Sequence, residues 1–454
     1  MNKNKLLASA MAVALTTLST NAVADATQDL IDALVTKGVL SPNEAEILAE
    51  QHKAEAKSEG RVTNKLGLES ADGKKTIKIS GRVQMDWRDF DLDTRSNEDA
   101  QDGDNFDIRR AYLGVSGKYD YIKYKFNGSF GAETKLDVAQ LSLSYYKPLQ
   151  IVFGQFKTSM SLEERTSSRF LNFTERSYVN NYAFTSAKDV GFSIYGTPTK
   201  GFNYAYAMVN GYGQNTDTPD GNDTYAHIFH ADVDLATMNK WKNQVAHLGV
   251  NYRMHDTEDN GLAQALEQRT LGRGYKFFTA TLDSGAGDLE MKTMGLEAAY
   301  ATGSFKVQGE YVTTEFDTSA ETQDMDAYYV DVGWLLTGEK YSKAYKSKSM
   351  GGKFDRIKPN SNFNPETGKG IGAWELMAGY NKFDASEMKT TSTGIATDAG
   401  KANESDSWRV GVKWILDPQT RIMLSYIDTD FEYEAGQSGD KDEQAINIRT
   451  QFDF

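Results

Sequence analysis

Hydrophobic and polar residues alternate along most of the chain after residue 76. In the stretch 76–87, one face carries the apolar residues Ile77, Ile79, Val83, Met85 and Trp87, and the other face carries polar residues. A period of two is typical of a β-strand with one apolar face. The same alternation recurs near residues 122–127, 139–145, 248–253, 330–336, 374–381 and 408–414, and in the final segment up to Phe454. The pattern therefore predicts an all-β architecture over residues 76–454.

The connectors between these predicted strands fall into two length classes. Residues 303–304 and 417–419 predict tight turns. We interpret the long polar connectors as external loops, at 89–107, 213–224, 255–290, 339–370 and 383–406. The alternating runs are about as long as a tilted strand that crosses a bilayer, whereas a soluble sandwich needs only ~5–6 residues per strand. At roughly 22–25 residues per strand and connector, we expect about 16 strands in a transmembrane antiparallel β-barrel with a water-filled lumen.

The N-terminal part of the chain follows a different pattern. Residues 1–24 contain two lysines, an apolar run and the small residues Ala22-Val23-Ala24, which predicts a signal peptide cleaved before Asp25. Residues 28–57 show helical spacing, with Ser41-Pro42 as a helix start. We therefore divide the chain into a signal peptide (1–24), a periplasmic helical segment and linker (25–75) and the barrel (76–454). The short N-terminal helical segment is either a trimerising or wall-contacting element or a linker helix.

Composition agrees with an exported membrane barrel. The chain has no cysteine, 24 tyrosines and a mean hydropathy of −0.57, and alternation hides an apolar face in such an average. Loss of Lys3 and Lys5 with the signal peptide changes the net charge from −14 to −16, which excludes nucleic acid as a partner by repulsion. We expect the outer membrane of a Gram-negative bacterium, with the apolar face against its lipid.

The residues that enzymes and metal sites require are sparse. The chain has five histidines, and His227 and His230 lie three apart on a predicted strand, hence on opposite faces. No G-x-S-x-G elbow is present. The acidic loop 215–223 is not followed by an EF-hand pattern and is interpreted as a solvated loop. The sequence thus predicts no enzyme, no cofactor and no metal site.

Arginines and small hydroxyl residues gather in the stretch EERTSSRFLNFTERS at 163–177, which follows a predicted strand at 151–157. Other short motifs are GRVQMD at 81–86, RRAYLG at 109–114, GQFK at 154–157, LLTGE at 335–339, and GGKFDRIKP followed by GAWEL between 351 and 376. With these motifs in this order, the chain resembles the phosphate-selective (polyphosphate/phosphate-type) outer-membrane porins from about residue 77 to Phe454.

The resemblance implies a 16-stranded homotrimeric barrel whose third loop folds into the lumen. It also implies an anion site, carried over by motif, at Arg82, Arg109, Arg110, Tyr112, Asp137, Ser167, Ser168 and Arg176. A guanidinium fork suits oxyanions, and serine hydroxyls add neutral donors. The expected function is an anion-preferring channel for phosphate or related small inorganic anions. The alternative is a diffusion porin of the same fold for other solutes, without phosphate selectivity.

Two residues depart from the family pattern, and two others conflict with regular strand alternation. Glu164 stands where the best-known phosphate-selective members have a lysine, and Lys157 stands where they have a tyrosine. Strand alternation places Arg82, Arg110 and Tyr112 toward the lumen, so the adjacent Arg109 requires a bulge or a loop end. Asp137 has the lipid-facing parity and must lie at the irregular start of its strand. Pairing of the loop arginines with Glu163, Glu164 and Glu175 remains an alternative reading.

Overall fold

A computed structural model describes most of the chain. The described residues are 34–37, 41–47, 61–63, 66–92, 105–131, 134–180, 183–185, 187–216, 224–257, 266–283, 286–439 and 441–454. The predicted signal peptide (1–24) and most of the acidic loop 215–223 lie outside them. The chain forms two compact units, one of residues 1–80 with 114–125 and one of residues 81–113 with 126–454.

The first unit contains short helical stretches and a small antiparallel ribbon. Residues 34–36 and 42–47 are helical. The Ser41 N–H donates to Glu44 Oε2 at 2.9 Å and the Glu44 N–H donates to Ser41 Oγ at 3.4 Å, so a reciprocal cap begins the second stretch where the sequence predicts it. Strand β1 (Arg61–Thr63) pairs with β2 (Gly67–Glu69), and β2 pairs with the first residues of β3. Within the described ranges, no helix combines the length and the apolar character needed to cross a membrane.

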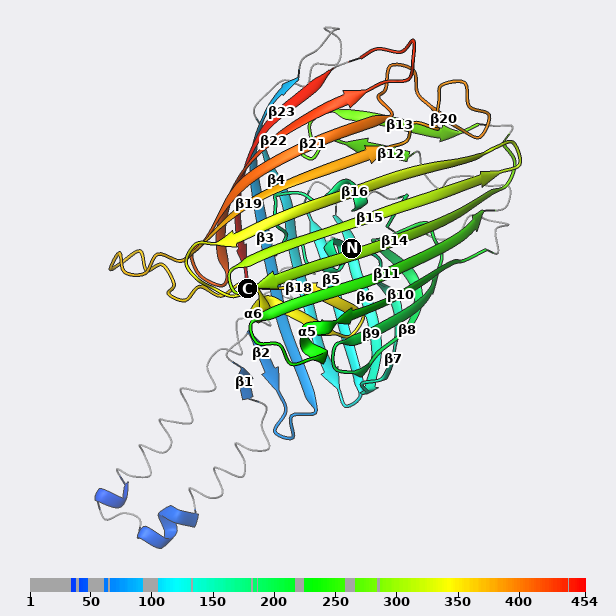
Figure 1. The fold of residues 1–454 in the computed structure, drawn as a ribbon. Coiled ribbons are helices and arrows are strands. Elements are labelled where there is room, and N and C mark those ends of the chain that lie inside the picture. The colour runs from blue at the N-terminus through cyan, green and yellow to red at the C-terminus, as the bar shows by residue number, and fades with distance from the viewer. Residues whose placement is uncertain are drawn as a thin grey trace, which may run out of the picture. The chain divides into compact units, whose positions relative to one another are not determined.

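In the described part of the chain, sixteen antiparallel strands build a closed barrel, as predicted (Figure 1). They are β3 (Lys75–Leu92), β4 (Asn105–Tyr119), β5 (Ile122–Phe130), β6 (Thr134–Tyr146), β7 (Leu149–Lys157), β8 (Lys188–Thr199), β9 (Phe202–Val209), β10 (Ala226–Asp234), β11 (Gln244–Thr257), β14 (Leu289–Thr302), β15 (Phe305–Thr318), β16 (Thr322–Leu335), β19 (Ala373–Asp384), β21 (Glu404–Ile415), β22 (Thr420–Glu432) and β23 (Asp442–Asp453). Pairing of β23 with β3, from Glu443↔Leu92 to Asp453↔Arg82, closes the cylinder.

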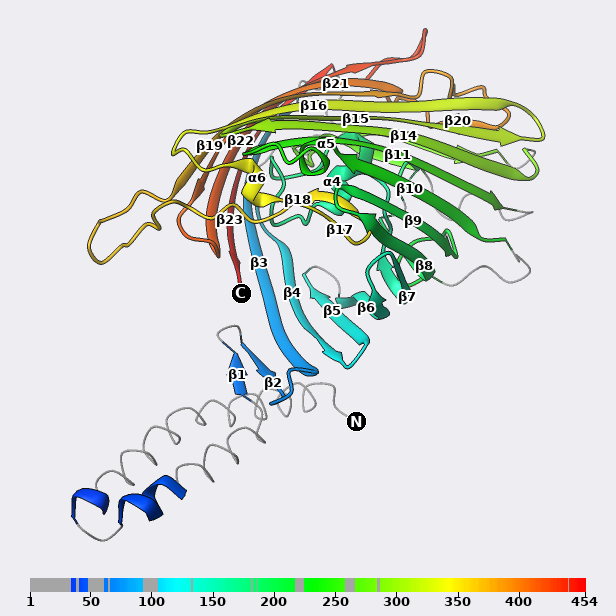
Figure 2. The same cartoon turned by 60° about the horizontal axis from the view of Figure 1, so that its bottom comes forward.

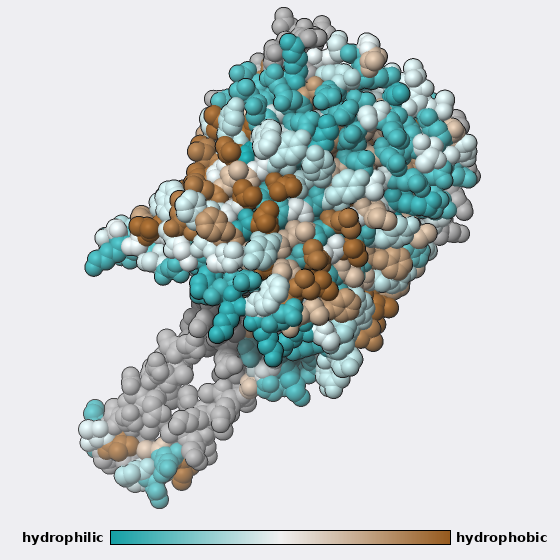
Figure 3. Space-filling model, in the orientation of Figure 1, coloured by the Kyte–Doolittle hydropathy of each residue, from teal (hydrophilic) through white to brown (hydrophobic). Residues whose placement is uncertain are grey.

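Alternation along each strand separates an outer from an inner face. On β16, Tyr328, Val330 and Val332 are exposed, whereas Tyr329 and Asp331 between them are buried. Hydrophobic side chains gather over the outer wall in Figure 3, which is the face that lipid would cover. The polar residues of the strands are thereby directed into the barrel.

The two ends of the barrel differ in the length of their connectors. Gly303-Ser304 joins β14 to β15 and Asp417-Pro418-Gln419 joins β21 to β22, so we call this the short-turn end. The connector at 385–403 and the described residues 210–216 and 266–283 lie at the opposite, long-loop end. There, β12 (Leu266–Arg269), β13 (Lys276–Leu282) and β20 (Ile395–Thr397) pair into a separate sheet.

The segment 336–372 lies at the short-turn end, so its interpretation as an external loop is wrong. The Leu335 N–H donates to the Ser304 carbonyl at 2.9 Å and the Tyr341 N–H donates to the Gly303 carbonyl at 3.1 Å. The physical reason is strand direction: β16 is the twelfth barrel strand, and every even-numbered strand of an antiparallel barrel runs back to the end where the first began.

Part of this segment folds back toward the inner loop described next. It contains α6 (Tyr341–Ala344), β17 (Tyr345–Lys348) and β18 (Gly351–Phe354). The Gly352 N–H donates to Asp232 Oδ2 on the inner wall at 2.8 Å. Figure 2 shows β18 next to the short helix α4 (Leu162–Arg165). Segments from both ends of the barrel therefore occupy the lumen.

The connector between β7 and β8, residues 158–187, is the inner loop. It contains α4 (Leu162–Arg165) and the 3₁₀ turn η1 (Tyr178–Asn180). The Tyr178 hydroxyl lies 2.7 Å from Ser407 Oγ on β21, and the Tyr178 ring meets Phe277 and Phe383 edge-on at centroid distances of 5.8 and 6.1 Å. The loop thus folds into the lumen and packs against the inner face of the β11–β23 half.

Candidate functional site

Arg82 on β3 and the inner loop form the centre of the candidate site. Arg82 Nη1 donates to Ser168 Oγ at 2.6 Å, and its guanidinium carbon lies 4.3 Å from the centroid of the Tyr112 ring. Arg82 Nε has no hydrogen-bond partner, and among the described residues Arg82 forms no ion pair. Because Ser168 Oγ accepts from the guanidinium, its own hydrogen remains available to donate. Three predicted residues therefore form one donor-rich group.

Arg109 and Arg110, adjacent on β4, meet the same carboxylate. Arg109 binds Glu175 through Nε at 2.7 Å and through Nη2 at 2.9 Å, whereas Arg110 Nη2 lies 3.8 Å from Glu175. The exposed residues of β4 change from even to odd numbers, with Phe106 and Ile108 exposed before the pair and Leu113 exposed after it. This change of phase lets two neighbouring side chains reach inward.

Glu175 remains ionised among these cations. Burial by itself raises the pKa of the Glu175 carboxyl, but the guanidinium groups of Arg109, Arg110 and Arg449 hold that pKa well below its usual range. Arg449 Nη2, on β23, lies 2.7 Å from Glu175 Oε1. One loop carboxylate thus fixes three wall arginines in position.

Arg176 occupies a second ion-pair group. Its Nε lies 2.9 Å from Glu164 Oε2 and its Nη2 donates to the Thr166 carbonyl at 2.9 Å. Lys157 Nζ lies 2.7 Å from the other oxygen of Glu164. The two departures from the family pattern, Lys157 and Glu164, are therefore in direct contact with each other, and Glu164 partners two cations.

Asp137 and Ser167 are close to the site but have other partners. Asp137 Oδ1 lies 2.7 Å from Lys188 Nζ. Asp137 and Val138 are both buried, between exposed Leu136 and exposed Leu141, so the alternation of β6 breaks here. Ser167 Oγ accepts from Arg169 Nε at 3.3 Å and is not among the contacts of Arg82. The predicted residues thus form several neighbouring groups and do not surround a single position.

Three contacting residues were not predicted from the sequence. Gln84 bridges the two groups, because its Nε2 donates to the Ser168 carbonyl at 3.1 Å and its Oε1 accepts from Arg110 at 3.2 Å. Gln84 shares the inward parity of Arg82, a signal that was present in the sequence. Arg449 has inward parity on the last strand, but no motif in the sequence around Arg449 or Lys188 indicates that either residue reaches this site.

Exposure shows where the passage runs. The cationic side chains of the site retain access to solvent: Arg169 is 32%, Lys157 is 29% and Arg176 is 17% exposed. On the opposite wall, Arg409 is 0% and Lys413 is 3% exposed. The open side of the lumen therefore lies between the inner loop and the β3–β8 wall.

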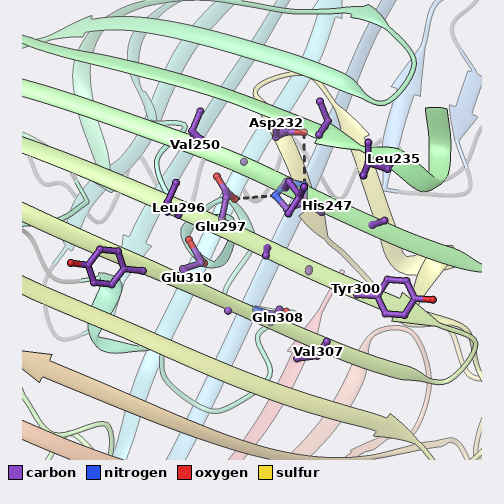
Figure 4. Close-up of a pocket in the computed structure, with 18 of the residues that line it drawn as sticks. Asp232, Leu235, His247, Val250, Leu296, Glu297, Tyr300, Val307, Gln308 and Glu310 are labelled. Carbon is purple, nitrogen blue, oxygen red and sulfur yellow. Dashed lines mark hydrogen bonds and ion pairs between the residues drawn. The ribbon is translucent and has the colours of Figure 1, made fainter. Parts of the chain in front are cut away.

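The opposite side of the lumen is held by a buried ionic cluster. Arg165 of the inner loop binds both oxygens of Glu297, at 3.0 and 2.5 Å. His247 Nε2 lies 3.1 Å from Glu297 Oε2, and Figure 4 shows His247 between Glu297 and Asp232. Within the described ranges, no group of three or more histidine or acidic side chains is arranged to hold a metal ion. This cluster fixes the inner loop against the wall.

Comparison with known proteins identifies the family. Residues 77–454 match the family described as phosphate-selective porin O and P. The chain belongs to this family. This porin is also 26% identical over 423 residues to Porin O of Pseudomonas aeruginosa, an alignment that covers 87% of the chain and 92% of that relative. The predictions of the family, of a channel and of an outer-membrane location are confirmed by this membership.

Solved structures share the fold of this porin. A loop L8 deletion variant of OmpT, an outer-membrane protein of Vibrio cholerae, superimposes with a TM-score of 0.51 at 11% identity, over 84% of this chain and all of the other. An anion-selective porin from Comamonas acidovorans gives a TM-score of 0.50 at 13% identity, again over 84% of this chain and all of the other. At these identities the likeness concerns the barrel alone.

Proposed function

We propose that this porin is an anion-preferring channel for phosphate or related oxyanions, with its constriction at Arg82, Tyr112 and Ser168. The observation that supports this most directly is the state of Arg82. It is a partly exposed guanidinium at the proposed constriction, with no ion pair among the described residues. A permanent charge that is not neutralised by a carboxylate attracts an oxyanion.

The charge balance around Arg82 supports the same preference. In the described structure, seven cationic side chains of the open side have four carboxylates as their ion-pair partners there. The cations are Arg82, Arg109, Arg110, Lys157, Arg169, Arg176 and Lys188, and the carboxylates are Asp137, Glu164, Glu175 and Asp453. The cations thus exceed the carboxylates by three. A narrow passage with a surplus of one sign concentrates ions of the other sign.

An ion would cross by exchanging water for protein donors. At the constriction, Arg82 N–H groups and the Ser168 hydroxyl replace part of the hydration shell of the oxyanion. The ion pairs at Glu175 and Glu164 hold the neighbouring guanidinium groups in place and moderate the field. Moderate binding is required, since an ion that is held too tightly does not leave.

Planar-bilayer recording tests this proposal. In a KCl gradient, we expect a reversal potential that shows anion preference, and we expect added phosphate to block the chloride current. Replacement of Arg82 by Gln should weaken the phosphate block at least about tenfold, since a charge-assisted hydrogen bond contributes about 1.5–3 kcal/mol. Lys147→Gln, which removes an exposed charge from the turn after β6, is the matched control.

Each outcome of this recording has a definite meaning. Cation preference would contradict the proposal. Anion preference with no phosphate block would favour the alternative, a diffusion porin without phosphate selectivity. An Arg82→Gln channel that behaves like Lys147→Gln would remove Arg82 from the proposed site.

We also propose a homotrimer in outer-membrane lipid, with residues 25–75 on the periplasmic side. The family resemblance supports the trimer, and the exposed apolar outer wall supports the lipid contact. Light scattering of the detergent-solubilised protein should give three times the chain mass. A mass equal to one chain would contradict the assembly.

A further inference from the structure

Three guanidinium groups from three separate elements surround one aromatic ring. The guanidinium carbons of Arg169, Arg356 and Arg421 lie 5.2, 5.1 and 5.1 Å from the centroid of Phe170. Arg169 and Phe170 belong to the inner loop, Arg356 belongs to the segment 336–372, and Arg421 is on β22. The face of an aromatic ring attracts cations, so Phe170 helps to hold three like charges together.

The described structure provides one carboxylate for these three cations. Asp453 Oδ2 lies 3.3 Å from Arg169 Nη1 and also binds Arg356 Nη2, and Asp453 Oδ1 lies 3.9 Å from Arg421 Nη2. The remaining hydrogen bonds of the arginines go to the Ser167 hydroxyl and to backbone carbonyls, as in the 2.7 Å bond from Arg421 Nη1 to the Arg169 carbonyl. Arg421 Nε is buried without a partner. The cluster therefore carries a surplus of two positive charges and an unused donor.

The cluster is open to solvent and adjoins the candidate site. The side chains of Arg169 and Arg356 are 32% and 22% exposed, whereas Asp453 is fully buried. Arg356 Nη1 donates to the carbonyl of Pro418, in a tight turn of the short-turn end. Arg169 Nε donates to Ser167 Oγ, and the next residue, Ser168, binds Arg82. The cluster thus lies between the constriction and the short-turn end.

We propose that Arg169, Arg356 and Arg421 form a second anion subsite, on the short-turn side of the constriction, for phosphate or another tetrahedral oxyanion. The inference rests on the proposed anion channel. Uncompensated like charges in a partly dehydrated site repel one another, and a bound oxyanion removes that repulsion. Arginine forks can bind several oxygens of such an anion at once. A second site next to the first gives the ion a place to move to, which favours release.

Arg356→Gln is the direct test, because Arg356 lies outside the strands. We expect phosphate block to weaken about tenfold, as for loss of one charge-assisted hydrogen bond. We also expect a lower anion preference in the KCl gradient. Lys369→Gln is the matched control, since Lys369 is an exposed cation of the same segment, outside the cluster. A phosphate block equal to that of Lys369→Gln would overturn the subsite and leave Arg356 as a structural partner of Asp453.

Asp453→Asn tests the same inference with the opposite sign. Removal of the carboxylate leaves three unneutralised guanidinium groups, so phosphate should block at lower concentration than in the unmodified channel. An unchanged or weaker block in a variant that still shows the folded barrel's mobility on gels without heating would contradict the subsite. This variant decides the question if Arg356→Gln does not fold.

The two proposals fail in different ways. If Arg82→Gln weakens the phosphate block and Arg356→Gln does not, the subsite fails and the anion channel stands. If the unmodified channel shows neither anion preference nor phosphate block, the proposed function itself fails.

Discussion

The two sides of the lumen are built from the same residue types and have opposite characters. On the β11–β23 side, basic and acidic groups such as Arg409, Lys413 and Glu297 are buried and paired. On the β3–β8 side, the cations are partly exposed and outnumber their partners. The two sides therefore differ less in their number of arginines than in the number of carboxylates that neutralise them.

A comparison of Arg409 with Arg82, one arginine from each side of the lumen, shows this contrast. Each is an inward arginine stacked on a ring of similar type, Arg409 at 4.2 Å from Phe173 and Arg82 at 4.3 Å from Tyr112. Arg409 Nη2 binds Asp331 at 3.0 and 3.1 Å and is completely buried. Arg82 has a serine in place of the carboxylate and remains partly exposed. One wall position therefore anchors the loop, and the other is available to a solute.

Replacement of Arg409 by Leu should give the largest effect. Asp331 would be left as a buried charge without its partner, which costs about 3–5 kcal/mol. The free energy of unfolding in detergent, measured by urea titration, should fall by that amount. Arg82→Gln is the comparison and should lose less than about 1 kcal/mol, since it leaves no buried carboxylate unpaired. Equal losses in the two variants would refute the contrast between the two sides.

Replacement of Glu164 by Gln should shift the passage further toward anions. Burial by itself raises the pKa of the Glu164 carboxyl, but Arg176 and Lys157 hold that pKa below its ordinary value, so the group is ionised at neutral pH. Its neutralisation frees two cations, and phosphate block should strengthen about three- to fivefold, the equivalent of about 1 kcal/mol. The double variant Lys157→Gln with Glu164→Gln preserves the net charge and should block like the unmodified channel. A weaker phosphate block in Glu164→Gln alone would argue against the proposed surplus of positive charge in the passage.

Glu163 gives the smallest expected effect, and it depends on pH. Burial raises the pKa of this loop carboxyl above its ordinary value of about 4.5, opposed by Arg409 and reinforced by Asp331. The folded state therefore binds the proton more tightly than the unfolded state. Stability should fall as the pH rises from the ordinary value through the raised one. In Glu163→Gln, this part of the pH dependence should vanish from unfolding curves recorded between pH 4 and pH 8. An unaltered pH profile would contradict the assigned direction.

Local periodicity was sufficient to predict the barrel. Alternation along 330–336 and 408–414 gave strands with the correct outward residues, and the length per strand gave sixteen. Parity also placed Arg82 and Tyr112 inward and required an irregularity at Arg109 and at Asp137, where β4 and β6 change phase. These features depend only on residues that are adjacent in the chain, so they could be predicted from the sequence.

Long-range features were not predictable in this way. The placement of 339–370 was wrong because loop length was used without counting strand direction. Which carboxylate meets which arginine also escaped prediction, since pairs such as Arg449 with Glu175 join residues far apart along the chain. Even a correct list of inward arginines does not reveal which one lacks a partner, because that depends on the packed inner loop.

The position of Arg356 gives the channel an electrical polarity. Its guanidinium enters from the short-turn end, and aromatic residues such as Phe277 and Phe278 fill the region toward the long-loop end. In the proposed channel, an anion would therefore meet more positive charge on the short-turn side of the constriction than on the long-loop side. Currents driven in the two directions across a planar bilayer should then differ in size.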